Sequence, residues 1–535
     1  MLRIDNIKTA PGADEALLRR KAAALLRVSE GEITALRVLR RSVDARDGVR
    51  FVWSAAVSLK NESAALKRCK NKNVTRYAPV IYALPQPVAA PKTRPVIVGA
   101  GPAGLFCALV LAKCGAKPIV LERGKCVEER RRDVETFWKT GALDPTSNVQ
   151  FGEGGAGAFS DGKLNTGTKD PRHGWILERF VEYGAHPDIL IDAKPHVGTD
   201  RLYVVLQNLR RALLSLGAEV RFGHRVIGVE VKHGAVSALQ IASPEGEYTL
   251  QARRVVLALG HSARDTFEAL HALGVPMEPK PFAVGVRIEH KQSAIDAAQY
   301  KEAAGHPALP PTSYKLAYHT RGGRGVFSFC VCPGGQVVAA ASEPGRVVTN
   351  GMSEFARNRE NINGGLLVSV TPDDFGGAPD DPLAGVAFQR RLEEAAYRAG
   401  GETYAAPAQT VGDFLAGRAS NAAGGVTPSY QPAVKWTDLR GCLPDFVCDA
   451  LAEALPELDK MLHGFAAPDA VLTAVESRSS SPVRITRDEG CQSALRGLYP
   501  CGEGAGYAGG IMSAAADGMR VAEAILRDQQ SCSRK

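Results

Sequence analysis

The stretch PVIVGAGPAGLFCALVLAKCGAKPIVLERG, Pro95–Gly124, decides the fold that this sequence predicts. Its apolar start PVIV is typical of a buried parallel strand. Gly99, Gly101 and Gly104 then form a G-x-G-x-x-G turn ahead of a helix rich in Ala and Leu, and a second buried strand, PIVL, runs into Glu122. Strand, glycines, helix, strand and acid in this order predict a Rossmann-type dinucleotide-binding unit.

The three glycines of this turn have separate predicted tasks. Gly99 permits the tight turn after the strand, and Gly101 lets the backbone approach a pyrophosphate. Gly104 lets the helix pack closely on the strand. A turn of this kind, in this context, indicates a bound adenine dinucleotide.

The residues beside the glycines complete the predicted nucleotide site. The helix begins at Pro102 and Ala103, where unpaired N–H groups and the helix dipole favour phosphate. We expect the Glu122 carboxylate, followed by Arg123, to accept both hydroxyls of the adenosine ribose. A carboxylate at this place disfavours a 2′-phosphate because the two negative charges repel.

The far end of the chain indicates which dinucleotide is bound. GLYPCGEGAGYAGGIMSAAADGMRVAEAILRD predicts a strand, a glycine-rich turn and a long helix of small residues. An N-terminal nucleotide unit completed by such a segment resembles the glutathione-reductase-like flavoproteins. The resemblance implies that Glu503, after Gly502, faces the ribityl–phosphate part of FAD. It also implies that the helix start directs N–H groups at the flavin pyrimidine ring, where negative charge gathers on reduction; these groups belong to Gly509, Gly510 and Ile511.

Two inner segments are expected to be cofactor neighbours, and either can instead be an ordinary strand of the sheet. ARRVVLALGHSARDT predicts a buried strand that enters a turn at Gly260, which would return the chain beneath the pyrophosphate. AEVRFGHRVIGVEV predicts a strand whose backbone, near Arg225 and Val226, lies beside the adenine.

The segment FGEGGAGAFSDGKL, Phe151–Leu164, contains five glycines. No buried strand precedes it and no Rossmann-type helix follows it, so it is not a second nucleotide unit. We predict a flavin cradle, in which glycine backbone lies against the flat isoalloxazine and polar side chains reach its reactive edge. The glycines are Gly154, Gly155 and Gly157, and the polar residues are Ser160, Asp161 and Lys163.

This segment, with KPHVGTD, GHSARDT, CPGGQVVAAASE, ESRSSSPVRI and YPCGEGAGYAGGI, closely resembles the FAD-dependent dehydrogenases, also described as NAD(FAD)-utilising dehydrogenases. The resemblance covers nearly the whole chain. It implies FAD as the cofactor and leaves the substrate open. We expect the FAD to be bound non-covalently, because no His or Cys is placed for a covalent link to the flavin. Because we find only one nucleotide unit, NADH or NADPH would bind transiently as an electron donor.

Three residues are candidates for the chemistry. Lys163 can assist hydride transfer at the flavin N5–C4 edge, or pair with Asp161. His261 can be an acid or base near the cofactor, or a residue bonded to backbone at a helix start. Tyr507 is a flavin neighbour with a proton to give. Polar residues ahead of the C-terminal FAD segment can contact an anionic substrate or form a buried ion-pair network; they are Glu476, Arg478 and Arg484.

Bulk composition narrows the class of protein. The 535 residues predict two to four domains, and the 45% apolar and 23% charged fractions are typical of soluble globular proteins. No apolar run has the length of a membrane span, and the first residues lack a secretory signal pattern. The eleven cysteines have no zinc-ligand spacing, and Cys330 and Cys332 do not form a C-x-x-C pair. We therefore expect reduced thiols in a cytoplasmic enzyme.

The positive charge is confined to the first part of the chain. The net charge is +9, and residues 1–95 hold 19 Lys and Arg against 8 Asp and Glu. This part has the order β-α-β-β-α, which resembles part of a ferredoxin-like α+β unit. The excess charge suggests an acidic protein or RNA partner, and a solvated face without a partner is the alternative.

The predicted fold class is α/β, with a Rossmann-type FAD-binding domain built from both chain ends, an inserted α+β substrate domain and an N-terminal ferredoxin-like module. The predicted boundaries are 1–78 for the basic module, 79–95 for a Pro-rich spacer, 96–275 and 476–526 for the FAD-binding domain, 276–475 for the substrate domain and 527–535 for a tail.

The expected activity is hydride transfer through flavin N5 to or from a small substrate. Two other flavoprotein activities stay open: a tRNA-modifying enzyme that uses the basic module, and a monooxygenase, which the lack of a clear D-G segment disfavours. A flavin-sensing binding protein is the non-enzymatic alternative.

Overall fold

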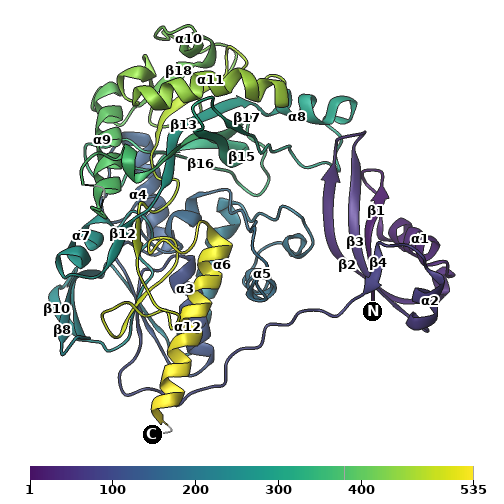
Figure 1. The fold of residues 1–535 in the computed structure, drawn as a ribbon, viewed down its shortest axis with the longest axis horizontal. Coiled ribbons are helices and arrows are strands. Elements are labelled where there is room, and N and C mark those ends of the chain that lie inside the picture. The colour runs from purple at the N-terminus through teal and green to yellow at the C-terminus, as the bar shows by residue number, and fades with distance from the viewer. Residues whose placement is uncertain (379, 534–535) are drawn as a thin grey trace.

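The computed structural model describes residues 1–378 and 380–533. An N-terminal α+β module stands beside a larger body, and the body combines a parallel-sheet domain with a second, mixed-sheet domain (Figure 1). The C-terminal helix returns to the parallel-sheet domain, so both chain ends of the body meet there (Figure 1). No helix within the described residues has both the length and the apolar character needed to cross a membrane.

The N-terminal module is a complete βαββαβ unit. Its sheet has the order β2-β3-β1-β4, with every neighbouring pair antiparallel. This is the ferredoxin-like arrangement, and the sequence pattern missed only β4, which is too short to show alternation. The elements are β1 (Leu2–Thr9), α1 (Glu15–Leu26), η1 (Glu30–Glu32), β2 (Ile33–Asp44), β3 (Arg50–Leu59), α2 (Glu62–Arg68) and β4 (Val74–Arg76).

The segment 79–95, expected to be an extended, semi-rigid spacer outside the core, packs on the body. It has no helix or strand, but Tyr82, Leu84 and Val88 lie against the main apolar core. The Tyr82 hydroxyl donates to Glu523 at 2.7 Å, and the Val88 N–H donates to the Cys114 carbonyl at 2.9 Å. Apolar side chains between the prolines explain the difference, because burying them is more favourable than leaving them in water.

The parallel sheet has the order β22-β11-β5-β6-β7. Its strands are β5 (Val96–Val98), β6 (Ile119–Glu122), β7 (Glu219–Phe222), β11 (Val255–Leu257) and β22 (Leu498–Pro500). The connecting helices are α3 (Pro102–Lys113), α4 (Val127–Thr140), α5 (Arg172–Glu182), η3 (Pro187–Leu190), α6 (Thr199–Ser215) and α7 (Arg264–Ala272). An antiparallel sheet of β8 (Arg225–Lys232), β9 (Ala235–Ser243) and β10 (Gly246–Gln251) is inserted before β11. The sheet therefore joins β22, from the C-terminal end, to strands that precede residue 260.

The C-terminal helix α12 (Ile511–Ser533) packs along α3. Residues 527–533, expected to be a tail, continue this helix. Asp528 on this extension accepts a hydrogen bond from the Tyr499 hydroxyl at 2.9 Å, which ties the last turns of the helix to β22. Residues 534 and 535 lie outside the described residues.

The mixed-sheet domain has the strand order β14-β15-β17-β13-β20-β18-β19, with β16 paired to β15. These strands are β13 (Phe282–Lys291), β14 (Ala317–His319), β15 (Gly325–Ala339), β16 (Thr349–Met352), β17 (Asn361–Val370), β18 (Ala406–Thr410), β19 (Val434–Trp436) and β20 (Val471–Glu476). Its helices are α8 (Gln292–Tyr300), η4 (Lys301–Ala303), η5 (Pro372–Asp374), α9 (Ala384–Ala399), α10 (Val411–Leu415), η6 (Leu439–Gly441) and α11 (Asp445–Met461). The pair β12 (Met277–Pro279) and β21 (Val483–Ile485) links the two domains at their boundary.

Candidate functional site

A cavity lies where the carboxyl ends of β5, β6 and β11 meet the first turns of α3 and α12. We call it the dinucleotide cavity, because ligands of open α/β sheets bind at this edge. Most residues predicted from the sequence line it: Gly99, Gly101, Pro102, Ala103, Glu122, Arg123, Gly155, Gly157, Ser160, Asp161, Lys163, Val226, Gly260, His261, Glu503, Gly509, Gly510 and Ile511. Gly104, Gly154, Gly502 and Tyr507 are not part of its lining.

The glycines of the first turn have the geometry that their predicted tasks require. Gly99 has φ +106°, and a Cβ there would lie 2.3 Å from the carbonyl oxygen of Ala258, the residue that follows β11. A Cβ on Gly104 would lie 1.9 Å from the Gly99 carbonyl oxygen, so only glycine lets α3 approach the turn. A Cβ on Gly101 would meet only the Gly155 Cα, at 3.9 Å, and would otherwise fill the cavity. The backbone at Gly101 therefore leaves space in the cavity for a ligand.

The Glu122 carboxylate accepts more hydrogen bonds from the protein itself than expected. Its Oε1 accepts the N–H groups of Gly124 and Gly152 at 2.9 and 3.0 Å, and its Oε2 accepts the N–H of Ala100 at 2.8 Å. Each carboxylate oxygen has about two lone-pair directions. Oε2 thus keeps capacity for one ribose hydroxyl, while the carboxylate as a whole also ties the glycine-rich segment to the dinucleotide turn.

The glycine-rich segment contains a short 3₁₀ helix, η2 (Gly155–Phe159), which begins after Gly154 in a left-handed conformation and ends at an extended Ser160. Its glycines pack first against the dinucleotide turn: the Gly154 N–H donates to the Ala100 carbonyl at 2.8 Å, and a Cβ on Gly155 would lie 3.2 Å from the Gly101 Cα. Gly155 and Gly157 face the cavity, whereas Gly154 faces Leu206 of α6. The flavin-cradle prediction therefore stays a prediction for Gly155 and Gly157, and Gly154 lies outside the cavity lining.

One anchor of this segment was missed by the sequence reading. Arg130 is fully buried and donates to the carbonyls of Asn148, Val149 and Glu153, at 2.6–3.0 Å. Burial lowers its pKa to about 10. Arg130 lies at helical spacing with Val134 and Phe137 on the apolar face of α4. A charged residue on an otherwise apolar helix face was the sequence signal from which a buried anchor could have been predicted.

The three candidates for chemistry differ in their surroundings. Lys163 lines the cavity, donates to the Val331 carbonyl and lies 3.7 Å from Asp161. Asp161 is completely buried and is held mainly by Arg357 and Ser353. Lys163 therefore keeps a charge that Asp161 compensates only in part.

Ser160 and Tyr507 are directed elsewhere than expected. The Ser160 hydroxyl donates to the Gly157 carbonyl at 2.8 Å and accepts the Gly162 N–H at 3.0 Å. The Arg487 guanidinium lies over the Tyr507 ring, with its Cζ 3.7 Å from the ring centroid. The structure therefore gives Ser160 a role in shaping its own loop, and it does not bring Tyr507 to the cavity.

His261 lies on the cavity wall beside Ser262, with Nδ1 3.1 Å from the Ser262 hydroxyl. Burial lowers its pKa to about 3, and the charges of Arg478 and Arg264 act in the same direction. The imidazole is therefore neutral near pH 7, where it can donate or accept a hydrogen bond but carries no proton to release as an acid.

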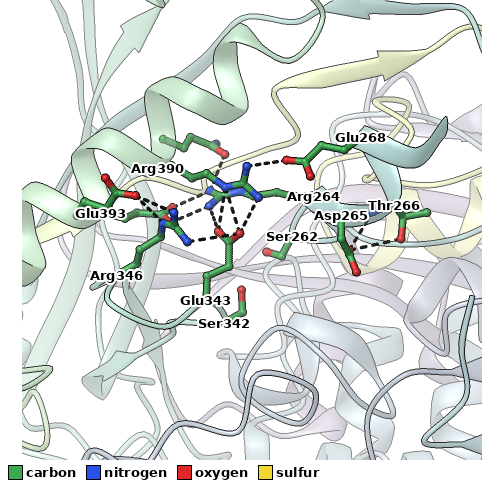
Figure 2. A network of polar contacts seen from close by, with 12 residues as sticks. Ser262, Arg264, Asp265, Thr266, Glu268, Ser342, Glu343, Arg346, Arg390 and Glu393 are labelled. Atoms are coloured by element: carbon green, nitrogen blue, oxygen red, sulfur yellow. Dashed lines mark hydrogen bonds and ion pairs between the residues drawn. The ribbon is translucent and has the colours of Figure 1, made fainter. Parts of the chain in front are cut away.

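The two arginines beside His261 belong to a buried ionic network. Arg264 lies between Glu343 and Glu393 (Figure 2), at 2.5 and 2.7 Å. Arg478 pairs with Glu393 at 2.8 Å and donates to Ser262 at 3.0 Å. Of the two roles considered for Arg478, the buried ion pair is the one observed, and its position at the cavity wall is compatible with a ligand contact as well. Arg484 lies over the Tyr507 ring and is exposed.

The mixed-sheet domain supplies the far end of the cavity. Phe329, Cys330, Asn350 and Glu476 line it together with residues of the parallel-sheet domain. Glu476 pairs with Arg287 at 3.0 Å, yet burial raises its pKa to about 7. Sequence reading identified Glu476 but not the other three, because nothing in their local pattern distinguishes them from ordinary strand residues.

The residues present fit an FAD molecule. The open space at Gly101 and the first turn of α3 suit a pyrophosphate, and the first turn of α12 suits the electron-rich side of a flavin ring. Among the described residues, none donates a hydrogen bond to the Glu503 carboxylate, which faces the cavity. Burial raises the pKa of Glu503 to about 7. A ligand hydroxyl at Glu503 would supply the partner that the protein does not.

Comparisons with known proteins agree with this assignment. Residues 93–273 match the family described as pyridine nucleotide-disulphide oxidoreductase, residues 281–479 match FAD-dependent protein, C-terminal domain-like, and residues 1–58 match a domain of unknown function. The chain is 45% identical over 530 residues to an uncharacterized protein of Clostridium beijerinckii, with 98% of each chain covered.

Two more distant similarities either cover a limited part of the chain or have a low TM-score. A 12-dehydrotetracycline 5-monooxygenase/anhydrotetracycline 6-monooxygenase of Streptomyces rimosus is 30% identical over 198 residues, 35% of each chain. The ternary complex of aklavinone-11 hydroxylase with FAD and aklavinone is 16% identical, with 82% of this chain and 64% of that chain covered, at a TM-score of 0.34. The family matches, and not these two proteins, identify FAD as the cofactor.

Proposed function

This chain belongs to the same family as the Clostridium beijerinckii protein and is a FAD-dependent oxidoreductase, and we propose that it is a dehydrogenase or reductase which moves an electron pair between its flavin and a small substrate held by the mixed-sheet domain. The observation that carries the proposal is the shared cavity. Its nucleotide end is built by the parallel-sheet domain, while Phe329, Cys330 and Asn350 of the mixed-sheet domain close the other end.

The residues that would hold the cofactor are those of the two helix starts and the turns before them. The dinucleotide turn and Glu122 would hold the adenosine and pyrophosphate, and Glu503 and Gly510 would lie at the flavin end. Bound FAD supplies reversible acceptance of an electron pair.

The far end of the cavity provides the charges and protons that such a reaction needs. Lys163 stabilises negative charge on a substrate or on the reduced cofactor, since its own partner Asp161 is already held by Arg357. Glu476 and Glu503 have pKa values raised to about 7 by burial, so each can hold or release a proton near neutral pH. His261 would orient a ligand as a neutral hydrogen-bonding group.

An anaerobic reduction screen tests this function. Purified holoenzyme is mixed with NADH, NADPH and candidate substrates under anaerobic conditions, and bleaching of the flavin absorbance band is followed. We expect one nicotinamide to bleach the band and a substrate to restore it. If the band recovers only with oxygen, and a hydroxylated product appears, the protein is a monooxygenase; if no donor reduces the flavin, the dehydrogenase proposal is wrong.

A further inference from the structure

The dinucleotide cavity opens to solvent beside Asn165. This residue lines the cavity and is exposed. Lys163, two positions earlier, also lines it and donates to the carbonyl of Val331 in β15. The adenosine end is marked instead by Glu122 and residues 224–226. The opening at Asn165 therefore lies where the mixed-sheet domain closes the cavity, on the side at which a substrate would enter.

A second segment of backbone runs along this opening. We call residues 191–197 the entrance segment, and it pairs antiparallel with the backbone on either side of Lys163. The Leu164 N–H donates to the Pro195 carbonyl at 2.9 Å. Because neighbours on antiparallel strands run in opposite directions, the next residues along, Asn165 and Lys194, border each other. Lys194 thus lies at the cavity entrance.

Lys194 brings a cation to the entrance that has no acidic partner. Within the described part of the chain it forms no ion pair, and its one hydrogen bond is to the Ser313 hydroxyl, at 3.4 Å. An ammonium has three N–H donors. Its remaining donors are therefore free to bind a ligand.

Two further cations share one carboxylate close by. Lys163 and Arg357 approach the same oxygen of Asp161, Oδ2, at 3.7 and 2.5 Å. Burial, followed by the charges of Arg357 and Lys163, lowers the pKa of Lys194, because like charges close together disfavour the charged form. One carboxylate thus faces three cations, and a bound anion would relieve their mutual repulsion.

The acids near the entrance segment are held by the N-terminal module. Asp188 and Asp192 bind Arg41 of β2 at 2.9 and 2.8 Å, and the Ala193 N–H donates to the Arg41 carbonyl at 2.8 Å. β2 is the edge strand of the module that lies toward the body (Figure 1). The excess positive charge of residues 1–95 therefore lies on the side of the entrance, where its field attracts anions.

We propose that the cavity entrance is an anion site in which Lys163 and Lys194 hold the carboxylate or phosphate group of the substrate, so that this enzyme acts on small organic anions. The proposal rests on the oxidoreductase function proposed above and names its substrate class. An ammonium on a flexible stem is a point charge that accommodates either group. Arg357 stays paired with Asp161 and adds its charge from behind.

Binding of simple probes tests the site. Purified holoenzyme is titrated calorimetrically with benzoate, with phenyl phosphate and with benzamide, which has the shape of benzoate without its charge. We expect one of the two anions to bind at least about tenfold more tightly than benzamide and to perturb the flavin absorbance band. The tighter of the two identifies a carboxylate or a phosphate as the preferred group. If neither anion binds more tightly than benzamide, the proposal is wrong.

A charge-matched pair of variants tests the role of Lys194. Lys194→Met removes the charge and keeps most of the volume, and the dissociation constant of the preferred anion should rise about tenfold. Lys194→Arg should bind the anion nearly as wild type does. Lys169→Met is the control, because Lys169 is exposed, lies outside the cavity lining and forms no ion pair among the described residues.

The control should keep wild-type anion affinity although its net charge equals that of Lys194→Met. Benzamide affinity, FAD content and thermal midpoint should be the same in all variants, which shows that each of them folds. Equal anion affinity in wild type and Lys194→Met would overturn the proposal. If nicotinamides fail to reduce the flavin while Lys194→Met weakens anion binding, the dehydrogenase proposal fails and the anion site stands.

Discussion

Gly155 and Gly101 lie back to back: a Cβ built on Gly155 would stand 3.2 Å from the Gly101 Cα. One glycine belongs to the segment expected to cradle the flavin, and the other to the turn expected to receive the pyrophosphate. The two loops thus form one double layer of backbone at the cavity wall, and a side chain on either glycine acts on a different neighbour.

Valine at these two glycines should have different effects. Gly101 has φ −77°, which any residue adopts, and faces open cavity, so Gly101→Val should fold but lose FAD. Gly155 has φ +60°, where a β-branched residue is strained, so Gly155→Val should shift the flavin spectrum and slow its reduction. The measurements are FAD content, visible spectrum and reduction rate of both variants. Gly167→Ala, in open space, is the control; a normal spectrum and rate in Gly155→Val would refute the cradle.

Removing the Glu122 carboxylate should affect both the cofactor and the loop. Glu122→Ala leaves three backbone N–H groups without their acceptor, each at a cost of about 1–3 kcal/mol if it stays buried. We expect FAD affinity to fall at least about tenfold and the thermal midpoint of the apoprotein to fall as well. Glu122→Gln keeps one carbonyl acceptor and should be intermediate. FAD retention and apoprotein stability equal to wild type in the alanine variant would exclude this role.

We expect His261 to lower the stability of the folded protein as the pH falls, because the buried imidazole resists protonation. Its pKa is about 3 in the folded protein against 6.5 ordinarily, so below pH 6.5 the unfolded chain binds a proton that the folded chain does not. The stabilising contribution is therefore complete above about pH 6.5 and is lost as the pH falls toward 3. His261→Asn should lose less stability between pH 7.5 and 5.5 than wild type does, measured as the shift in thermal midpoint of the holoenzyme.

The exposed His463 provides the control for this experiment, because its side chain is 99% accessible. His463→Asn should follow the wild-type pH dependence. The pH profile of flavin reduction should have no inflection from His261 near neutral pH. An inflection near pH 6.5 that disappears in His261→Asn would show that the imidazole titrates normally and acts as an acid or base.

Shortening the chain should separate the module from the segment that follows it. No cavity-lining residue precedes Val98, so chains beginning at Ala78 and at Lys92 should both bind FAD. The shorter chain lacks Tyr82 and Val88, which hold Glu523 and the end of α3, and should unfold at a lower temperature. Equal midpoints would show that residues 78–91 are only a spacer, whereas loss of FAD from both chains would show that the module supports the core.

The N-terminal module is attached more firmly than its sequence suggested. Arg41 binds Asp188 and Asp192 at 2.9 and 2.8 Å, and Ala308 and Leu309 of the body pack against the module core. Some of the basic charge therefore pairs with acids of this same chain. An acidic protein or RNA partner for the remaining charge stays a prediction, testable by the salt dependence of tRNA binding.

The sequence by itself determined the local parts of this protein. The G-x-G-x-x-G turn, the acid at the end of β6 and the glycine turn before α12 are read from neighbouring residues, because tight turns and helix starts depend on local backbone geometry. The meeting of both chain ends in one domain was expected from the resemblance to the glutathione-reductase-like flavoproteins, and the order of the strands in the sheet was not predicted.

Only the tertiary structure decided which side chains share the cavity and what state they are in. The Glu122 carboxylate accepts backbone N–H groups of two other loops, and the Tyr507 ring packs against Arg487. His261 is neutral because it is buried and because Arg478 and Arg264 lie beside it. Glu476 and Glu503 have pKa values raised to about 7 by burial, because the pKa of a buried group is set by the charges and solvent around it and not by its sequence neighbours.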